Sequence, residues 1–435
     1  MNPLDPTTVS ILGFIALFGL MLLRMPIGLA MGFVGVCGFA YMRGWDAALH
    51  VLALVPIRTA TDAGFTVIPL FLLMGAIATL SGMSAELFKA ANSFLGHKKG
   101  GLGMATIAAC AGFAAISGSS VATAATFSAV AYPEMRKFNY PQSFATGVIA
   151  AGGTLGAILP PSIVLAVYSL ITQQDLGRLY IAGVVPGILA ILMYILTITV
   201  ISIVRPNFLP QGPKSTWAER LTAIKGVWAI ALLFVLVIGG IYAGVFTPTE
   251  AGAMGATGAL IIAVVRRRLN WAQFVECLMR ALRTAAAIFS ILIGALIFGY
   301  FLTITQTPQH VTEFLTGLGL SKYGLLVLIM LMYLVLGCVM DAMAMIILTV
   351  PIIFPVIVAL GFSPIWFGII IVMTVELGMI HPPVGMNVFV IKSVIKDVKL
   401  STIFYGVIPF VITDLIRLAL LIIFPALALW LPSIR

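Results

Sequence analysis

Charge is scarce in this sequence. Charged residues fill only 9% of its 435 positions, whereas hydrophobic residues fill 61%, and the mean hydropathy is +1.16. A soluble fold of this length would expose far more charge, so lipid must be the solvent for much of the surface. A spanning helix takes about 20 apolar residues, which leaves room for roughly ten spans. The composition therefore predicts an all-α membrane protein that crosses the bilayer many times.

The residues of metal, redox and nucleotide chemistry are few and scattered. The histidines share no ligand spacing, and no HExxH, P-loop or dinucleotide-binding pattern is present. Four isolated cysteines lie in apolar stretches without metal-binding or redox spacing, namely Cys37, Cys110, Cys277 and Cys338. The sequence therefore gives no indication of ATP hydrolysis, and we expect no enzymatic activity.

The net charge of +10 comes from basic residues in short loops between apolar segments. In a membrane protein such residues report orientation, because loops rich in Lys and Arg stay in the cytoplasm. This placement argues against nucleic-acid binding. Asp5, with no basic cluster before the first apolar run, indicates a retained span rather than a cleaved signal peptide.

Two apolar segments, 101–132 and 323–359, are too long for one span and are interrupted by small or polar residues. Basic residues flank the first at both ends, so it is predicted to be a re-entrant hairpin that opens to the cytoplasm, with Ser117–Ser120 at its tip. The second has little positive charge at its ends and is predicted to open to the periplasm. With both termini periplasmic, ten further segments are predicted to span the membrane: 8–23, 25–42, 64–82, 144–172, 179–204, 226–245, 250–265, 284–304, 365–391 and 404–431.

An internal repeat relates the two hairpins. At an offset of 222 residues several prolines and glycines, which constrain the backbone, coincide: Pro133 with Pro355, Gly156 with Gly378, and Pro160-Pro161 with Pro382-Pro383. Each unit is therefore predicted to be a hairpin followed by a span that is broken in its middle. Five crossings separate the units, so they are inverted in the membrane, and inverted repeats with broken helices are typical of secondary transporters. The alternative is that the paired prolines only kink two ordinary helices.

The helix breaks are predicted to supply ligands for a monovalent cation. Breaks at 152–162 and 376–387 free backbone carbonyls, and the hairpin tip at 117–123 adds hydroxyl oxygens. Asp341 and Glu376 are carboxylates within apolar segments, where such residues are costly and are functional candidates. A structural hydrogen bond is an equal alternative for Asp341 and the favoured one for Glu376.

Other polar features are predicted to be structural. Asp414 and Arg417 lie at i and i+3 in the last span and are expected to pair with each other. His381 is expected to donate a hydrogen bond, and Thr249 to cap a helix whose first turn holds Glu250. Two short amphipathic segments are predicted to lie on the membrane surface or to connect a scaffold to a moving domain, those at 46–62 and 306–320.

At these residues the sequence resembles the large membrane subunit of the tripartite ATP-independent periplasmic (TRAP) transporters over nearly its whole length. The matching stretches are weak singly and specific together: Arg24-Met25-Pro26-Ile27-Gly28, Ile68-Pro69-Leu70-Phe71, Ser117-Gly118-Ser119-Ser120, Pro133-Glu134-Met135, Pro160-Pro161-Ser162, Thr247-Pro248-Thr249-Glu250-Ala251 and Pro382-Pro383-Val384-Gly385-Met386-Asn387. The resemblance implies a Na⁺-coupled importer of the bacterial inner membrane with an elevator-like motion. It implies a periplasmic binding protein that delivers an organic acid, such as a C4-dicarboxylate, sialic acid or another sugar or keto acid. It also implies a separate, small four-helix membrane subunit that packs against this chain.

The resemblance also implies where the ligands bind. The coupling ion Na⁺ would occupy at least two sites at the hairpin tips and helix breaks, drawn from Ser117, Gly118, Ser119, Gly152, Thr154, Gly156, Gly337, Asp341, Ala342, Glu376, Gly378 and Met379. The substrate would contact Ser119, Ser120, Thr154, Pro161, Ser162, His381, Pro383 and Asn387. His381 departs from the threonine that is common in the family at this place, so it bears on the second sodium site or on substrate preference.

The predicted organisation alternates scaffold and moving parts. Scaffold helices are expected at 1–96, a first transport unit at 97–187, central scaffold helices at 188–305, a second transport unit at 306–409 and a C-terminal helix at 410–435. A stand-alone transporter of the related divalent-anion/Na⁺ type would share the inverted hairpins and need no binding protein. An intramembrane enzyme with Ser119 or Ser120 as nucleophile is disfavoured, because no base accompanies them at suitable spacing.

Overall fold

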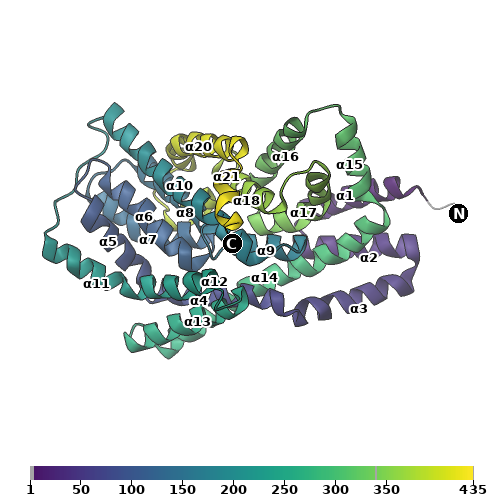
Figure 1. The fold of residues 1–435 in the computed structure, drawn as a ribbon, viewed down its shortest axis with the longest axis horizontal. Helices are drawn as coiled ribbons and strands as arrows, with labels where there is room; N and C mark the ends of the chain where they lie inside the picture. Colours follow the sequence, from purple (N-terminus) through teal and green to yellow (C-terminus); the bar gives the residue numbers. More distant parts are fainter. Residues whose placement is uncertain (1–3, 339, 435) are drawn as a thin grey trace.

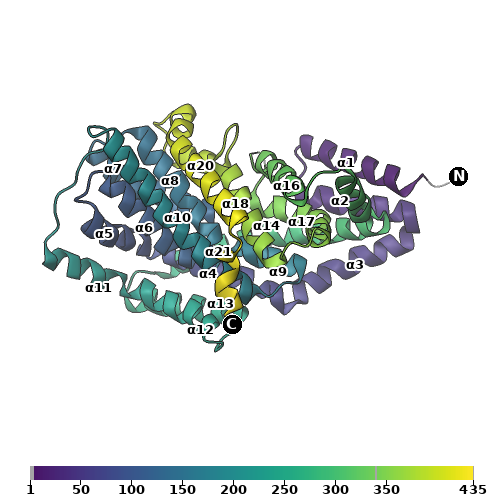
Figure 2. The ribbon, with the colours of Figure 1, turned by 45° about the horizontal axis from the view of Figure 1, so that its top comes forward.

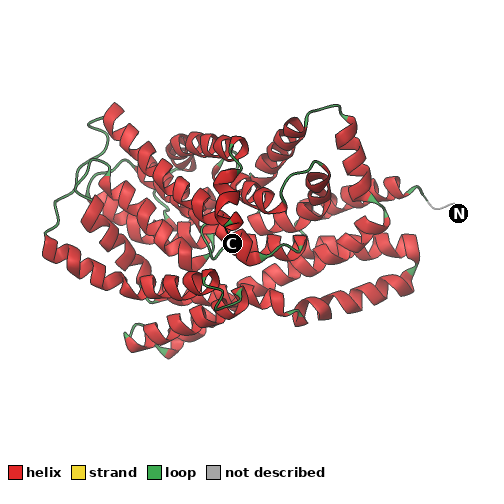
Figure 3. Cartoon of the chain, viewed as in Figure 1, coloured by secondary structure: helices red, strands yellow, loops and turns green. Residues whose placement is uncertain are grey.

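The computed structural model describes residues 4–338 and 340–434, and the regular structure in these ranges is helical apart from an isolated bridge between Lys99 and Gln211 (Figure 3). Eight helical segments of the described chain have the length and composition to cross a membrane, and five shorter helices are also apolar. The predicted all-α polytopic fold is confirmed.

One group of helices forms a long band along one side of the molecule, and we call it the scaffold (Figures 1 and 2). Its N-terminal members are α1 (Pro6–Leu22), α2 (Ile27–Arg43), α3 (Trp45–Thr61), a short 3₁₀ helix (Ala63–Thr66) and α4 (Val67–Leu80). Its central members are α11 (Trp217–Phe234), a π-helical turn (Val235–Gly239), α12 (Gly240–Tyr242), α13 (Pro248–Val265) and α14 (Trp271–Ile304). The long α14 packs along α2, α3 and α4, and α13 packs along α4.

Two helix starts in the scaffold differ from the prediction. The cap of α13 is Thr247 rather than Thr249, because Pro248 takes the first helical position and Glu250 completes a capping box with Thr247. The helix predicted at 284–304 begins much earlier, at Trp271, where Asn270 and Gln273 form another capping box. The first turns of α14 are polar, so hydropathy alone did not reveal them.

The two predicted repeats are present, and each is a hairpin followed by a broken helix. The first consists of α6 (Gly101–Ser117), α7 (Ser120–Lys137), α8 (Gln142–Ile158) and α9 (Ile163–Thr172). The second consists of α16 (Lys322–Gly337), α17 (Ala342–Ala359), α18 (Pro364–Ile380) and α19 (Met386–Val394). A long helix follows each, α10 (Leu176–Val204) and α20 (Leu400–Ile423), and α21 (Ala426–Ser433) comes last. The Pro160-Pro161 and Pro382-Pro383 peptide bonds are both cis.

The breaks are shorter than predicted. Residues 152–158 and 376–380 remain helical, so the irregular backbone is limited to 159–162 and 381–385. Proline explains this boundary, because it lacks the amide that would continue the helix but leaves the preceding turns intact. The span predicted at 404–431 is also divided, since α20 ends at Ile423 and α21 begins after Pro425.

Each hairpin tip is hydrogen bonded to the break of its own repeat. The amide of Ile163 donates to the carbonyl oxygen of Gly118 at 3.2 Å, and the amide of Gly385 donates to the carbonyl oxygen of Cys338 at 3.3 Å. Ile163 and Gly385 correspond at the offset of 222 residues. The two repeats therefore share a backbone arrangement as well as a sequence pattern.

Glycine permits the close approach of each hairpin to its broken helix. A Cβ on Gly156 would lie 2.6 Å from the carbonyl carbon of Ser119, and a Cβ on Gly378 would lie 2.8 Å from the Cα of Gly337. A similar contact joins two scaffold helices, where a Cβ on Gly28 of α2 or on Gly294 of α14 would overlap the backbone of the other helix. Gly28 belongs to one of the stretches that carry the family resemblance, and this packing is its structural role.

Two short helices connect scaffold helices to hairpins. α5 (Met83–Leu95) joins α4 to α6, and α15 (Thr307–Gly317) joins α14 to α16. The 222-residue offset maps one onto the other. A connecting element was predicted at 306–320, whereas the other candidate, 46–62, forms α3 and packs against α2 and α14. The counterpart that the sequence analysis missed is α5.

A buried polar network joins the long helices of the two repeats. Arg417 pairs with Asp414 at 2.8 Å, which confirms the predicted pair, and the hydroxyl of Tyr194 donates to Asp414 at 2.7 Å. Thr154 of α8 lies 3.0 Å from the same hydroxyl. Because α10 also packs along α6, α8 and α18, and α20 packs along α8, both long helices lie with the repeats rather than with the scaffold.

This network predicts that Arg417→Met lowers stability by about 3–5 kcal/mol, because Asp414 is left as an uncompensated buried charge. The melting temperature of the purified protein in detergent would measure the loss. The double variant Asp414→Asn/Arg417→Met removes both charges and keeps an acceptor for Tyr194, so it should recover most of the difference. Equal melting temperatures for Arg417→Met and wild type would contradict the assignment.

Candidate functional site

The tips of both hairpins line a cavity of about 590 Å³ that faces the scaffold. Hairpin 1 contributes Ser117–Ala122, hairpin 2 contributes Asp341–Met343, and α9 adds Ile163 and Val164. The opposite wall is formed by α4 and by one face of α14, through Gly75, Thr79, Arg280, Arg283, Thr284, Ile288 and Ile291 among others. The cavity therefore lies between the two repeats and the scaffold.

The polar groups of the hairpin tips are partly used to hold the tips in shape. Ser119 caps α7 by accepting from the amide of Ala122 at 3.3 Å, and Asp341 caps α17 by accepting from the amide of Met343 at 3.0 Å. The hydroxyls of Ser117 and Thr123 lie 3.1 Å apart. The carboxylate of Asp341 thus has the structural role considered for it and also borders the cavity.

Two arginines of α14 supply the positive charge of the cavity. Arg280 forms an ion pair with Glu276 one turn earlier, whereas Arg283 has no carboxylate within 4 Å among the described residues. Guanidinium groups present a planar fork of donors that fits carboxylates. Sequence reasoning misses both arginines, because the apolar segment begins only at 284, whereas the helix begins at Trp271. Two basic residues spaced i, i+3 next to an apolar run are the signal that could have found them.

The candidate residues of the first break lie behind the cavity rather than in its lining. Gly152 packs against Cys110, Gly156 packs against hairpin 1, and Thr154 belongs to the buried network with Tyr194. Ser162 caps α9, with its hydroxyl accepting from the amide of Leu165 at 3.1 Å. The carbonyl oxygen of Pro161 approaches Gly118, so this break contributes a backbone oxygen next to the tip of hairpin 1.

Glu376 ties the second broken helix to the first hairpin. The hydroxyl of Ser120 donates to its carboxylate at 3.0 Å, so the favoured structural hydrogen bond is present. The other carboxylate oxygen is buried without a hydrogen-bond partner among the described residues, and so is the whole side-chain amide of Asn387. Both are therefore buried polar groups of the second repeat that lack hydrogen-bond partners among the described residues.

The second break gathers backbone oxygens around Gly385, whose amide is bonded to the tip residue Cys338. A Cβ on Gly385 would lie 3.2 Å from the carbonyl oxygens of both Met379 and His381. The Nδ1 atom of His381 lies 2.6 Å from the carbonyl oxygen of Pro382, the hydrogen bond expected for it. Pro383 is exposed, and neither it nor His381 lines the cavity at the hairpin tips.

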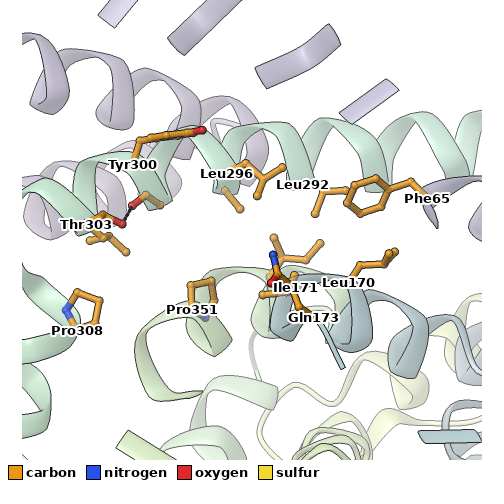
Figure 4. A pocket seen from close by; sticks show the side chains of 14 residues that line it. Phe65, Leu170, Ile171, Gln173, Leu292, Leu296, Tyr300, Thr303, Pro308 and Pro351 are labelled. Carbon is orange, nitrogen blue, oxygen red and sulfur yellow. Dashed lines mark hydrogen bonds between the residues drawn. The ribbon is translucent and has the colours of Figure 1, made fainter. Parts of the chain in front are cut away.

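A second cavity, of about 390 Å³, lies along the other half of α14 (Figure 4). Leu292, Leu296, Tyr300 and Thr303 of α14 face Leu170 and Ile171 of α9, Gln173 directly after it, and Pro351 of α17. A continuous face of α14, from Arg280 to Thr303, thus lines both cavities. The first cavity carries the charged groups, and the second is mainly apolar.

Inverted hairpins, broken helices and a cavity shared with a scaffold define a membrane transporter. The profile of the family described as "Tripartite ATP-independent periplasmic transporter, DctM component" matches residues 14–427, and the chain belongs to this family. The resemblance found from the sequence motifs is therefore confirmed. Membership makes the chain a multi-pass transporter permease that operates without ATP.

Characterised relatives span nearly the same length. The chain is 37% identical to the C4-dicarboxylate TRAP transporter large permease protein DctM of Pseudomonas aeruginosa, covering 89% of this chain and 90% of that one. It is 30% identical to the sialic acid permease SiaM of Vibrio cholerae, covering 98% of each chain. It is 33% identical to the 2,3-diketo-L-gulonate permease YiaN of Escherichia coli, covering 89% and 91%.

A solved structure shares the fold. The YdaH transporter of Alcanivorax borkumensis, whose topology is described as unusual, superposes with a TM-score of 0.53 over 89% of each chain at 14% sequence identity. At that identity the likeness concerns the fold alone.

The close packing of Gly156 on hairpin 1 predicts that Gly156→Ala lowers stability by about 1–3 kcal/mol, because the added methyl group meets backbone atoms that have to shift. Melting temperatures in detergent would measure the effect. Gly19→Ala is the matched control, since a Cβ on Gly19 in α1 has no neighbour within 4 Å. The packing argument fails if the two variants melt at the same temperature.

Proposed function

We propose that this chain is the permease subunit of a Na⁺-coupled importer that carries a small organic acid across the bacterial inner membrane. A periplasmic binding protein delivers the acid, and a small four-helix membrane subunit packs against this chain. The observation that carries the proposal is the cavity where both hairpin tips face Arg280 and Arg283. The relatives named for C4-dicarboxylate, sialic acid and 2,3-diketo-L-gulonate support an organic acid as the substrate.

The cavity suits recognition of a carboxylate. Arg283 offers donors without a competing carboxylate within 4 Å among the described residues, and the hydroxyls of Thr284, Ser119 and Ser120 border the same space. In a site of low dielectric constant, hydrogen bonds to charged groups are stronger than neutral ones. Substrate therefore binds with its carboxylate toward α14 and its remaining atoms against the hairpin tips.

Sodium is proposed to bind where the hairpin tips meet the breaks. At the first repeat the available oxygens are the carbonyl of Pro161 and the hydroxyls of Ser117 and Ser119. At the second repeat they are the carbonyls of Met379 and His381, which converge on Gly385 beside the tip residue Cys338. Carbonyl and hydroxyl oxygens are the hard ligands that such a cation favours.

The face of α14 that lines both cavities supports an elevator-type motion. Arg283 and Thr303 are 20 residues apart on this face, a distance of about 30 Å along a helix axis. The hairpins and broken helices are joined by hydrogen bonds and glycine contacts, so they move together. The connecting helices α5 and α15 join this moving part to the scaffold.

Uptake into proteoliposomes tests the proposal. Vesicles containing this chain and its small membrane subunit, with an inward Na⁺ gradient, are expected to accumulate a labelled organic acid only when the cognate binding protein is added. Replacing the Na⁺ gradient by a K⁺ gradient is expected to abolish uptake. Sodium-driven uptake without any binding protein would instead identify a stand-alone anion transporter.

A second prediction concerns recognition of the substrate's carboxylate by Arg283. Arg283→Gln is expected to lower the initial uptake rate about tenfold or more, because a charge-assisted hydrogen bond contributes roughly 1.5–3 kcal/mol. Arg178→Gln is the matched control, since Arg178 is exposed at the start of α10 and lies outside the cavity. Equal uptake rates in the two variants would remove Arg283 from the binding site.

A further inference from the structure

A third cavity lies at the basic end of the scaffold, away from the hairpins. It has a volume of about 540 Å³ and sits where the loop between α13 and α14 meets the end of α4. Its polar lining consists of Ser81, Arg267, Arg268, Asn270 and Gln273. No carboxylate is part of this lining, so the cavity has the composition of an anion site.

The positive charge of this cavity is largely uncompensated. Glu86 is the nearest carboxylate, and it is held by Arg266 through two hydrogen bonds of 2.7 and 2.8 Å. Arg268 reaches the same carboxylate only at 3.7 Å, and Arg267 has no ion-pair partner within 4 Å among the described residues. The capping box of α14 uses the amide oxygens of Asn270 and Gln273, which leaves their NH₂ groups as donors.

The surroundings place this cavity at the height of lipid headgroups. Val265, directly before the arginines, is 73% exposed, and Trp271, three residues after them, is 77% exposed. Exposed aliphatic side chains continue along α13 at Ile261 and Val264. An exposed tryptophan beside such a face is typical of a membrane–water interface, and a run of arginines is typical of its cytoplasmic side. A soluble anion would make no contact with this apolar face, whereas the acyl chains of a lipid would.

We propose that this cavity binds the headgroup of an anionic phospholipid from the cytoplasmic leaflet. Arg267 and Arg268 hold the phosphate, the amide groups of Asn270 and Gln273 donate to the headgroup oxygens, and the acyl chains lie along Ile261 and Val265 of α13. Juxtamembrane basic residues attract anionic lipids of this leaflet. Because Arg268 also faces Glu86 of the connecting helix α5, the lipid lies next to the attachment of that helix.

Native mass spectrometry of the full-length protein in detergent tests the proposal, with phosphatidylglycerol and phosphatidylcholine of matched acyl chains as probes. Wild type is expected to retain phosphatidylglycerol more tightly than phosphatidylcholine. Arg267→Gln/Arg268→Gln is expected to weaken phosphatidylglycerol binding about thirtyfold, since each of the two basic residues near an anionic membrane surface contributes about 1 kcal/mol. If the double variant does not fold, Arg267→Gln alone is expected to weaken binding in the same direction.

Lys98→Gln/Lys99→Gln is the matched control, because it removes the same charge from another exposed basic loop. An equal loss of phosphatidylglycerol in both double variants would show diffuse attraction and overturn the proposal. Displacement of the lipid by inorganic phosphate at equal concentration would show a soluble-anion site and overturn it as well. Loss of the lipid when the small membrane subunit binds would assign the cavity to that partner instead.

Discussion

In a membrane protein each peptide group within the hydrocarbon has to find its partner inside the protein, and this constraint governs the structure at both helix breaks. The paired prolines interrupt α8–α9 and α18–α19, and the hairpin tips supply the missing acceptors to Ile163 and Gly385. If a hairpin moved away from its broken helix, the amide and the carbonyl group of this bond would both lose their hydrogen-bond partner. The glycines at 156 and 378 follow from the same requirement, because they let the backbones come close enough to bond.

The repeats share a backbone plan but differ in their polar side chains. Thr154 and Glu376 occupy corresponding positions at the 222-residue offset. Thr154 contacts Tyr194 within the buried network, whereas Glu376 accepts from Ser120 of the other repeat. The hydrogen bond between Glu376 and Ser120 joins the two repeats to each other. Thr154, at the corresponding position of the first repeat, makes a different contact.

Punctuation residues made most of the fold predictable, because proline and glycine act locally. The paired prolines locate both breaks, and the offset of 222 residues between them relates the two hairpins from sequence alone. Arg280 and Arg283 escaped prediction because polar first turns hid the true start of α14. The contacts of Thr154 with Tyr194 and of Glu376 with Ser120 join distant segments, which spacing along a chain does not encode. The ligand roles assigned from the sequence stay predictions.

The contact between Gly28 and Gly294 lies behind the middle of α14, between the stretches that line the two cavities. It fixes how far this helix stands from α2, and thereby how much clearance remains on its opposite face. A single methyl group at either glycine would displace α14 toward the repeats and narrow both cavities together. Residues that face neither cavity, with Gly28 and Gly294 among them, thus help to set the clearance on the opposite face of α14.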